Sequence, residues 1–427
     1  MWEHEHVPIE MEKLADSLSG KLETLRPLSK ECSIYRVPEP KRCLHPSHYT
    51  PQMVSIGPFH HGKEELKAME EHKRRYLKCF LQRTKVRMAR FLAFIKDREV
   101  ELRNCYAEII HNLQSDEFVT MVLVDAVFLI EFFLRNYKDN LITDDDRFFR
   151  KPELYYVIRY DFYLLENQLP LFILGDLFNL ANTATYDDLY KNVSIVSITC
   201  FFLRADILAV LPIDKNLLEI HFSEAKHFLD LLILCLQQSQ SRPQIVLKDL
   251  NIPGVKELHQ GGIKFKSGSS ECLLDIKFNN GILEIPSLTV YRRTERLFRN
   301  LLDFESMHGY TRYFNDYIIM MCNLISSPKD AELLIENEII GLGYTETLPA
   351  IFRSLDEECI MDKSNFQYSG IVTNLQSYRK LPWHKWNTTL KQNYFNTSWA
   401  SISVIAAVIL LLLTVIQTVC SLIERIA

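Results

Sequence analysis

The sequence has no closely spaced cysteine pair and no excess of basic residues. Its ten cysteines are scattered, no two lie closer than 11 residues, and no Cys-x-x-Cys motif occurs. This spacing argues against a zinc site or a disulfide framework and indicates reduced thiols in a domain that faces the cytosol. The formal net charge is −5 at pH 7. Because a nucleic-acid-binding chain needs basic residues to offset phosphates, nucleic acid is not an expected partner.

Familiar catalytic signatures are absent as well. The chain contains no phosphate-binding P-loop, no GxGxxG, no GxSxG and no HExxH. Each of these motifs places a loop or a nucleophile where a known chemistry needs it. Their absence makes a familiar nucleotide-dependent or hydrolytic enzyme less expected, and the sequence predicts no cofactor and no metal.

The two ends of the chain differ in character. The N-terminus carries four glutamates among its first 12 residues, where a secretory signal would need positive charge and an apolar run. Near the other end, no charged residue occurs between positions 392 and 423. Residues 399–423 would form a helix of ~37 Å, long enough for a hydrocarbon core of ~30 Å. We therefore predict a C-terminal transmembrane helix that contacts membrane lipid, with a buried core helix as the alternative.

The charges that flank residues 399–423 predict the orientation of this helix. Four Lys or Arg residues lie in 379–391, whereas Arg425 alone follows the span. The positive-inside rule then predicts a single-pass, tail-anchored protein whose N-terminal bulk is cytosolic. The Asn-x-Ser/Thr triplets at Asn192, Asn387 and Asn396 argue the other way, because glycosylation would require a translocated bulk.

Apolar periodicity predicts a mainly α-helical protein with a small antiparallel β-meander. We expect an N-terminal lead-in over 1–34 and a large helical domain over 35–375. Alternating apolar residues and an Asn280-Gly281 turn place the meander at about 261–291, with a second turn at 267–270. A basic and aromatic juxtamembrane segment, 376–398, would precede the span.

Three local patterns refine this expectation. Five prolines within 35–62 are expected to prevent a helix and favour an extended, wrapping segment. Apolar residues at steps of three and four predict one long amphipathic helix from about 64 to 96. Ser115 is a candidate N-cap for an apolar central helix, and Pro170 is expected to start the second of two later helices.

The stretch SIGPFHHG, residues 55–62, is dense in residues that often form sites. We expect Gly57 and Pro58 to turn the chain and Phe59 to be buried. The imidazoles of His60 and His61, with Gly62, would then tie the turn to the core or start a helix. A metal site would need three or four converging ligands, and contact with a partner or a small ligand is a further alternative.

Four carboxylates interrupt apolar helices, namely Asp125, Glu131, Asp161 and Glu166. Because buried charge is costly unless it is paired, we expect a buried network with arginines such as Arg135, Arg159 and Arg204. Glu166, Asn167 and Gln168 would cap the next helix or hold the corner between helices. A glycosidase-like acid pair would instead need two carboxylates facing an open cleft.

Seven stretches in order along nearly the whole chain resemble the plant family known as domain of unknown function 247. They are IYRVPEP (34–40), YTPQMVSIGPFHHG (49–62), EEHKRRYL (70–77), VDAVFLIEFF (124–133), DFYLLENQLPLFIL (161–174), DIKFNNGILEIPSL (275–288) and YFNTSWASISVIAAVILLLLTVIQTV (394–419). Two departures are Asp125-Ala-Val-Phe128, where the family commonly has Asp-Gly-Cys-Phe, and His45.

The resemblance implies a plant protein with one C-terminal membrane span and no known activity. Some grass members of the family are implicated in self-incompatibility recognition, which by analogy favours recognition over catalysis. We therefore expect a membrane-anchored, non-enzymatic recognition or signalling protein that acts through protein partners, as a homo- or hetero-oligomer or alone. The alternative is an uncharacterised enzyme, such as a hydrolase, that uses His60, His61, Asp161 and Glu166.

Overall fold

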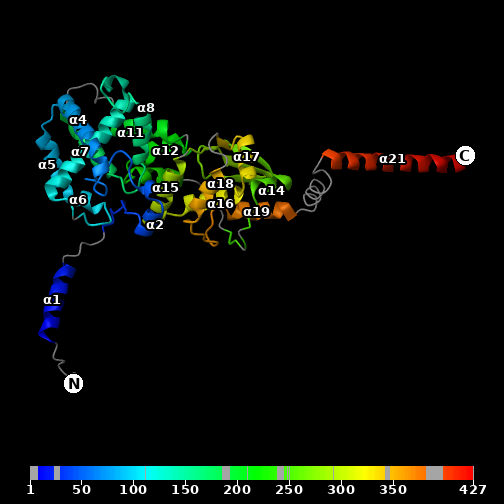
Figure 1. Ribbon diagram of the computed structural model, residues 1–427, viewed down its shortest axis with the longest axis horizontal. Helices are drawn as coiled ribbons and strands as arrows, with labels where there is room; N and C mark the ends of the chain where they lie inside the picture. The colour runs from blue at the N-terminus through cyan, green and yellow to red at the C-terminus, as the bar shows by residue number, and fades with distance from the viewer. Residues whose placement is uncertain are drawn as a thin grey trace.

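A computed structural model of the chain is mainly helical, with one elongated body and two outlying helices. The helices α1 (Ile9–Glu23) and α21 (Ser398–Ile426) lie outside that body (Figure 1). The mainly helical prediction is confirmed. The triplets at Asn192, Asn387 and Asn396 and most of the predicted juxtamembrane segment lie outside the described residues. Those residues are 8–23, 29–110, 112–184, 193–208, 210–237, 245–247, 249, 251–291, 293–341, 347–380 and 398–426.

The central element is α7 (Ser115–Tyr137), which is buried along most of its length. Its apolar side chains face neighbours in nearly all directions, as expected for a helix without a polar face. Its N-cap is Gln114, one residue before the predicted Ser115, because the Gln114 and Glu117 side chains form a capping box. The surrounding helices are α4 (Lys67–Thr84), α5 (Met88–Asp97), α9 (Leu171–Ala184) and α11 (Ile195–Asp206).

The predicted single helix over 64–96 is wrong, because the chain breaks between α4 and α5. Lys85 adopts a left-handed conformation, with φ of 56°, and its N–H donates to the Leu81 carbonyl at 3.0 Å. Such a residue ends a helix. The break lets α5 fold back so that Phe91 packs against Phe80 with ring centroids 5.5 Å apart. A 3₁₀ turn, η1 (Glu64–Leu66), precedes α4.

The second half of the body is built around α15 (Thr294–His308). This helix is buried along most of its length and contacts α13 (Phe228–Gln237), α16 (Tyr313–Leu324) and α18 (Leu348–Asp356). The remaining helical elements are α6 (Glu99–Asn104), η2 (Asp139–Leu141), α8 (Pro152–Asp161), α12 (Lys215–His221), α14 (Val255–Gln260), α17 (Pro328–Glu336) and α19 (Ser369–Lys380).

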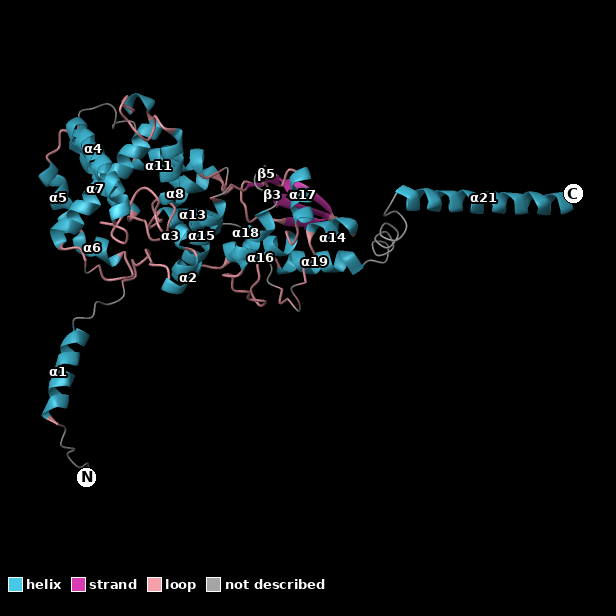
Figure 2. Cartoon of the chain, viewed as in Figure 1, coloured by secondary structure: helices cyan, strands magenta, loops and turns pink. Residues whose placement is uncertain are grey.

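The predicted antiparallel meander is wrong in one pairing. The strands β1 (Lys264–Gly268), β2 (Lys277–Asn279) and β3 (Ile282–Pro286) form a sheet in the order β1-β3-β2. Figure 2 shows β3 close to α14 and α17. The Asn280-Gly281 turn joins β2 and β3 as predicted, but β1 runs parallel to β3. The chain does not turn at 267–270, because residues 269–276 bury three apolar side chains on the way to β2.

A second, two-stranded sheet lies beside the first one. It pairs β4 (Leu288–Thr289) in parallel with β5 (Ile340–Gly341), and the sequence pattern did not indicate it. Each strand has only two residues. Period-two alternation cannot be detected over such a length.

Residues 34–62, called the wrapping segment from here on, are mostly irregular, as the prolines predicted. Two short helices interrupt the segment, α2 (Glu39–Leu44) and α3 (Pro46–Tyr49). Each has a proline in its first turn, where the missing N–H costs nothing. The prolines therefore shorten helices here and do not prevent them.

The C-terminal apolar run is helical. The helix α21 spans 29 residues, and the side chains described in it are exposed. Within the part of the chain that the structure describes, no helix meets the combined length and apolarity that crossing a bilayer requires. The predicted span over 399–423 is therefore not confirmed.

Candidate functional site

The Asp161 carboxylate binds the backbone of the wrapping segment. Its carboxylate accepts hydrogen bonds from the backbone N–H groups of Gln52, Met53 and Val54, at 2.7 to 3.1 Å. The Arg296 guanidinium lies 3.1 Å from the same carboxylate. Burial raises the pKa of Asp161, and Arg296 and the three backbone bonds oppose that rise. Both carboxylate oxygens are therefore used in holding the segment.

Asn167 and Gln168 continue this attachment at the corner before α9. The Asn167 side chain accepts from the Ile56 N–H at 2.7 Å and donates to the Val54 carbonyl at 3.0 Å. Gln168 stabilises the corner before α9 and joins it to α13. Its side chain donates to the Phe162 and Leu164 carbonyls and accepts from the Phe228 N–H. Pro170 then precedes α9, which begins at residue 171.

Asp125 and Lys73 form the attachment at the turn of SIGPFHHG. Asp125 accepts from the Gly57 N–H at 2.9 Å and from Lys73 Nζ at 2.5 Å, and Lys73 also donates to the Ser55 carbonyl. Burial raises the pKa of Asp125, and the Lys73 ammonium opposes the rise. Gly57 has φ of +76°, and a Cβ there would lie 2.5 Å from the Gln168 carbonyl oxygen. Only glycine adopts this positive φ without strain and also leaves room for the carbonyl oxygen.

His60 and Glu166 meet in the interior. His60 Nε2 lies 3.3 Å from Glu166 Oε2, and both residues are about 1% exposed. Glu166 also accepts from the Val37 N–H at 2.9 Å and lies 3.4 Å from Arg42. Burial lowers the pKa of His60, and the contact with Glu166 opposes this fall. For Glu166 burial acts against ionisation, but the contact with His60 and the bond from Val37 outweigh it and lower the pKa.

The remaining residues of the motif pack as the sequence suggested for a structural turn. Pro58 is buried, and Phe59 makes an edge-on contact with Tyr106 at 5.5 Å while Arg36 lies over its other face at 4.7 Å. Gly62 has φ of +79° with no atom near its missing Cβ. Its conformation, and not close packing, therefore favours glycine.

The arginines that pair with the buried carboxylates differ from those expected. Glu131 contacts Arg135 at 3.6 Å, as expected, and also Arg83. Arg159 lies over the rings of two tyrosines of α8, and Arg204 pairs with a surface glutamate of α12. Arg296 binds Asp161 and Arg42 binds Glu166, and both arginines come from segments distant in sequence.

The candidate catalytic residues do not share one open cleft. His60, Asp161 and Glu166 are buried in contacts with the wrapping segment, whereas the neighbouring His61 lines a surface pocket. No group of three His, Cys, Asp or Glu side chains among the described residues is arranged to hold a metal ion. The geometry thus separates a buried structural network from an accessible pocket.

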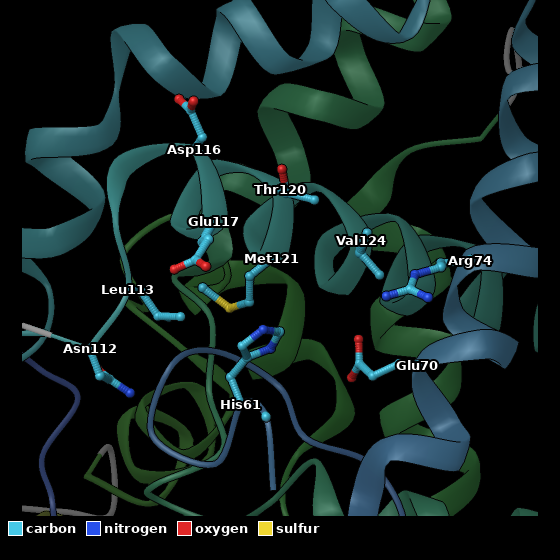
Figure 3. Close-up of a pocket in the computed structure, with 11 residues that line it drawn as sticks. His61, Glu70, Arg74, Asn112, Leu113, Asp116, Glu117, Thr120, Met121 and Val124 are labelled. Carbon is cyan, nitrogen blue, oxygen red and sulfur yellow. The ribbon is translucent and has the colours of Figure 1, made fainter. Parts of the chain in front are cut away.

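The pocket lies between α4, the start of α7 and the end of SIGPFHHG, with a volume of about 550 Å³. Figure 3 shows the His61 ring pointing into it beneath Met121, with Glu117 on one side and Arg74 and Glu70 on the other. The other lining residues are Gly62, Asn112, Leu113, Asp116, Thr120 and Val124. Sequence analysis identified His61 and Gly62 as candidate site residues but none of the other residues that line the pocket.

Lys73 is the most informative residue that sequence analysis missed. It is fully buried, although lysine is rarely buried unless paired. A signal was present, because Lys73 lies four residues after Met69 and four before Leu77, on the apolar face of α4. A lysine on an apolar helical face indicates a buried partner carboxylate, here Asp125.

Comparison with known proteins assigns the family. Residues 34–413 match the family model DUF247, described as a plant protein of unknown function. UPF0481 protein At3g47200 of Arabidopsis thaliana is 27% identical, over 91% of this chain and 86% of its own length. Putative UPF0481 protein At3g02645 of the same plant is 24% identical, over 94% of this chain and 92% of its own. No solved structure matches. The chain therefore belongs to the DUF247 family of plant proteins.

Proposed function

We propose that this chain is a non-enzymatic recognition or signalling protein that acts through protein partners. We further propose that residues 399–423 attach it to a membrane with the body in the cytosol. The observation that carries the first part is the use of His60, Asp161 and Glu166 in holding the wrapping segment. A general acid or base must reach a proton of the substrate, directly or through one water. Asp161 and Glu166 instead bind the chain's own backbone and arginines, and His60 faces Glu166 in the interior.

The character of α21 supports membrane attachment. Nine apolar side chains in its central part are 48–66% exposed, from Val408 to Val419. Contiguous apolar surface of this kind marks an interaction site in a stable protein. A bilayer fits an all-round apolar helix better than a groove does, because a groove covers only one face of a helix.

Vesicle flotation of the full-length protein tests the attachment. A double variant, Leu411→Arg with Val415→Arg, places two charges at the centre of the apolar run. Each charge costs about 2.5–3.5 kcal/mol there, so the variant should remain at the bottom of the gradient while the unaltered protein floats with phosphatidylcholine vesicles. The matched control is Leu411→Ala with Val415→Ala, which should float. Equal flotation of all three proteins, or of none, would refute the attachment.

Capture of partners tests the recognition role. Full-length protein in plant membranes should crosslink to a discrete set of proteins, and Glu166→Gln protein that remains folded should crosslink to the same set. Loss of a measurable hydrolytic turnover in His60→Gln or Glu166→Gln protein, with the partner set and the folding unchanged, would favour the enzyme alternative.

A further inference from the structure

The pocket that His61 lines carries one exposed cation, Arg74, and one exposed anion, Glu117, and neither forms an ion pair with the described residues. We propose that it binds a small zwitterion whose ammonium and carboxylate lie at opposite ends of a short chain. This inference is independent of the proposed function, since a recognition protein can act with or without a bound small molecule. It rests on the contacts of Glu117 and Arg74 and on the apolar side chains that line the pocket between them.

Glu117 supplies the anionic wall. Its carboxylate points toward the pocket (Figure 3) and accepts the Gln114 N–H at 3.2 Å, which leaves most of its acceptor capacity open. No Lys or Arg among the residues described by the structure forms an ion pair with it. The neighbouring Asp116 points away from the pocket in the same view, with Lys96 4.0 Å from its carboxylate. Glu117 is thus the carboxylate available to a ligand ammonium.

Arg74 supplies the cationic wall on the opposite side. The nearest lining carboxylate in the figure is Glu70, which is already bound to Lys73 at 2.5 Å. Lys73 in turn is fully buried with Asp125 and holds one oxygen of Glu70. Within the described ranges, no carboxylate forms an ion pair with Arg74. A guanidinium in this state can bind a ligand carboxylate through two parallel hydrogen bonds.

The floor and the size of the pocket define the middle of the ligand. Leu113, Met121 and Val124 line the floor and are buried. A pocket of about 550 Å³ lies within the usual range for small-ligand sites. Glu117 and Arg74 lie on opposite sides of the His61 ring (Figure 3). This arrangement favours a ligand that carries its two charges at the ends of a chain, such as an ω-amino acid or a dipeptide, over a free α-amino acid.

The His61 ring is half-buried and points into the pocket (Figure 3). Its Nδ1 atom is out of contact with solvent and forms no hydrogen bond with the described residues. Because water does not reach this nitrogen, a ligand in the open pocket does not reach it either. His61 therefore offers the ligand the surface of its ring.

Calorimetric titration of the full-length protein with matched probes tests the proposal. The probes are 6-aminohexanoate, glycyl-leucine, hexanoate, which lacks the ammonium, and hexylamine, which lacks the carboxylate. We expect both zwitterions to bind at least tenfold more tightly than either single-charge probe, since each charged hydrogen bond supplies about a tenfold gain. Equal affinity for hexylamine and 6-aminohexanoate would overturn the proposal, as would the absence of binding by both zwitterions.

Variants assign each end of the ligand. Glu117→Gln should weaken 6-aminohexanoate about tenfold and leave hexanoate unchanged, whereas Arg74→Gln should weaken 6-aminohexanoate and leave hexylamine unchanged. Glutamine retains the capping box at the start of α7, so Glu117→Gln protein should fold. The controls are Glu153→Gln in the first turn of α8 and Arg90→Gln on α5, with the same charge changes outside the pocket. Loss of binding in the controls, or none in the pocket variants, would contradict the assignment.

Discussion

Lys73 Nζ lies 2.5 Å from Asp125 Oδ1, and both residues are fully buried. The pair joins α4 to α7 beneath the turn of SIGPFHHG, because Asp125 also binds the Gly57 N–H. A buried salt bridge between α4 and α7 thus holds the turn of SIGPFHHG in place. The first consequences to test concern stability.

Lys73→Met removes the ammonium and leaves the Asp125 carboxylate buried without its cation. Breaking one partner of a buried pair costs about 3–5 kcal/mol, so we expect a loss of that size in the free energy of unfolding by urea. Lys67→Met is the control, because the Lys67–Glu64 pair is exposed, and its change should stay within about 0.5 kcal/mol. A loss below about 1 kcal/mol for Lys73→Met would show that this pair does not support the turn.

Gly57→Ala and Gly309→Ala form a matched pair of substitutions. Both glycines have positive φ, +76° and +79°, but a Cβ at residue 57 would lie 2.5 Å from the Gln168 carbonyl oxygen, and no atom lies within 4 Å at residue 309. Gly309→Ala should cost about 1 kcal/mol for the left-handed backbone alone. Gly57→Ala should cost clearly more, by thermal or urea unfolding. Equal costs would mean that the turn can move away from the corner before α9.

The buried ring of His227 predicts a pH dependence of stability. Burial lowers its pKa to about 4, against 6.5 in the unfolded chain, and its Nε2 contacts the Ser33 carbonyl at 3.0 Å. A depressed pKa contributes stability that is complete above pH 6.5 and is lost as pH falls toward 4. Relative to His227→Gln, the protein should lose about 3 kcal/mol over that window. Parallel stability curves for the two proteins between pH 7 and 4 would contradict this.

Hydrogen exchange tests how Asn167 holds the wrapping segment. The Ile56 N–H donates to the Asn167 side chain at 2.7 Å. It should exchange slowly in the unaltered protein and much faster in Asn167→Ala protein, because that bond is then lost. Amides of α16 should be unchanged. Asn323→Ala on α16 is the control, since the Asn323 side chain donates to the Ile319 carbonyl of its own helix and to no other group among the described residues. Faster exchange of Ile56 in the control, or none in Asn167→Ala, would argue against the role of Asn167.

Local sequence patterns predicted the elements whose causes are local. The apolar run of α7 and the Asn280-Gly281 turn depend on residues near in sequence, and both lie where expected within one residue. The break at Lys85 was missed, because a left-handed lysine has no sequence signature and the apolar period continues across it. The parallel pairing of β1 with β3 was missed because the buried side chains of residues 269–276 decide it through tertiary packing.

The same difference between local and long-range causes applies to the candidate site. Burial costs predicted that Asp161 and Glu166 need partners, but not which ones. Arg296 reaches Asp161 from 135 positions later in the chain, and the backbone donors to Asp161 come from more than 100 positions earlier. Only the fold brings these groups together. Lys73 could have been identified, since its place on the apolar face of α4 is a local signal.

Equilibrium unfolding of Asp161→Asn and Glu166→Gln proteins tests the central claim, that these carboxylates hold the wrapping segment. Residues kept for catalysis tend to lower stability, so replacing them often leaves stability unchanged or raises it. The account predicts the opposite, a loss of about 2–4 kcal/mol for each variant in urea, because each leaves a buried arginine or backbone donor without a charged acceptor. Unchanged or increased stability in both variants would contradict it.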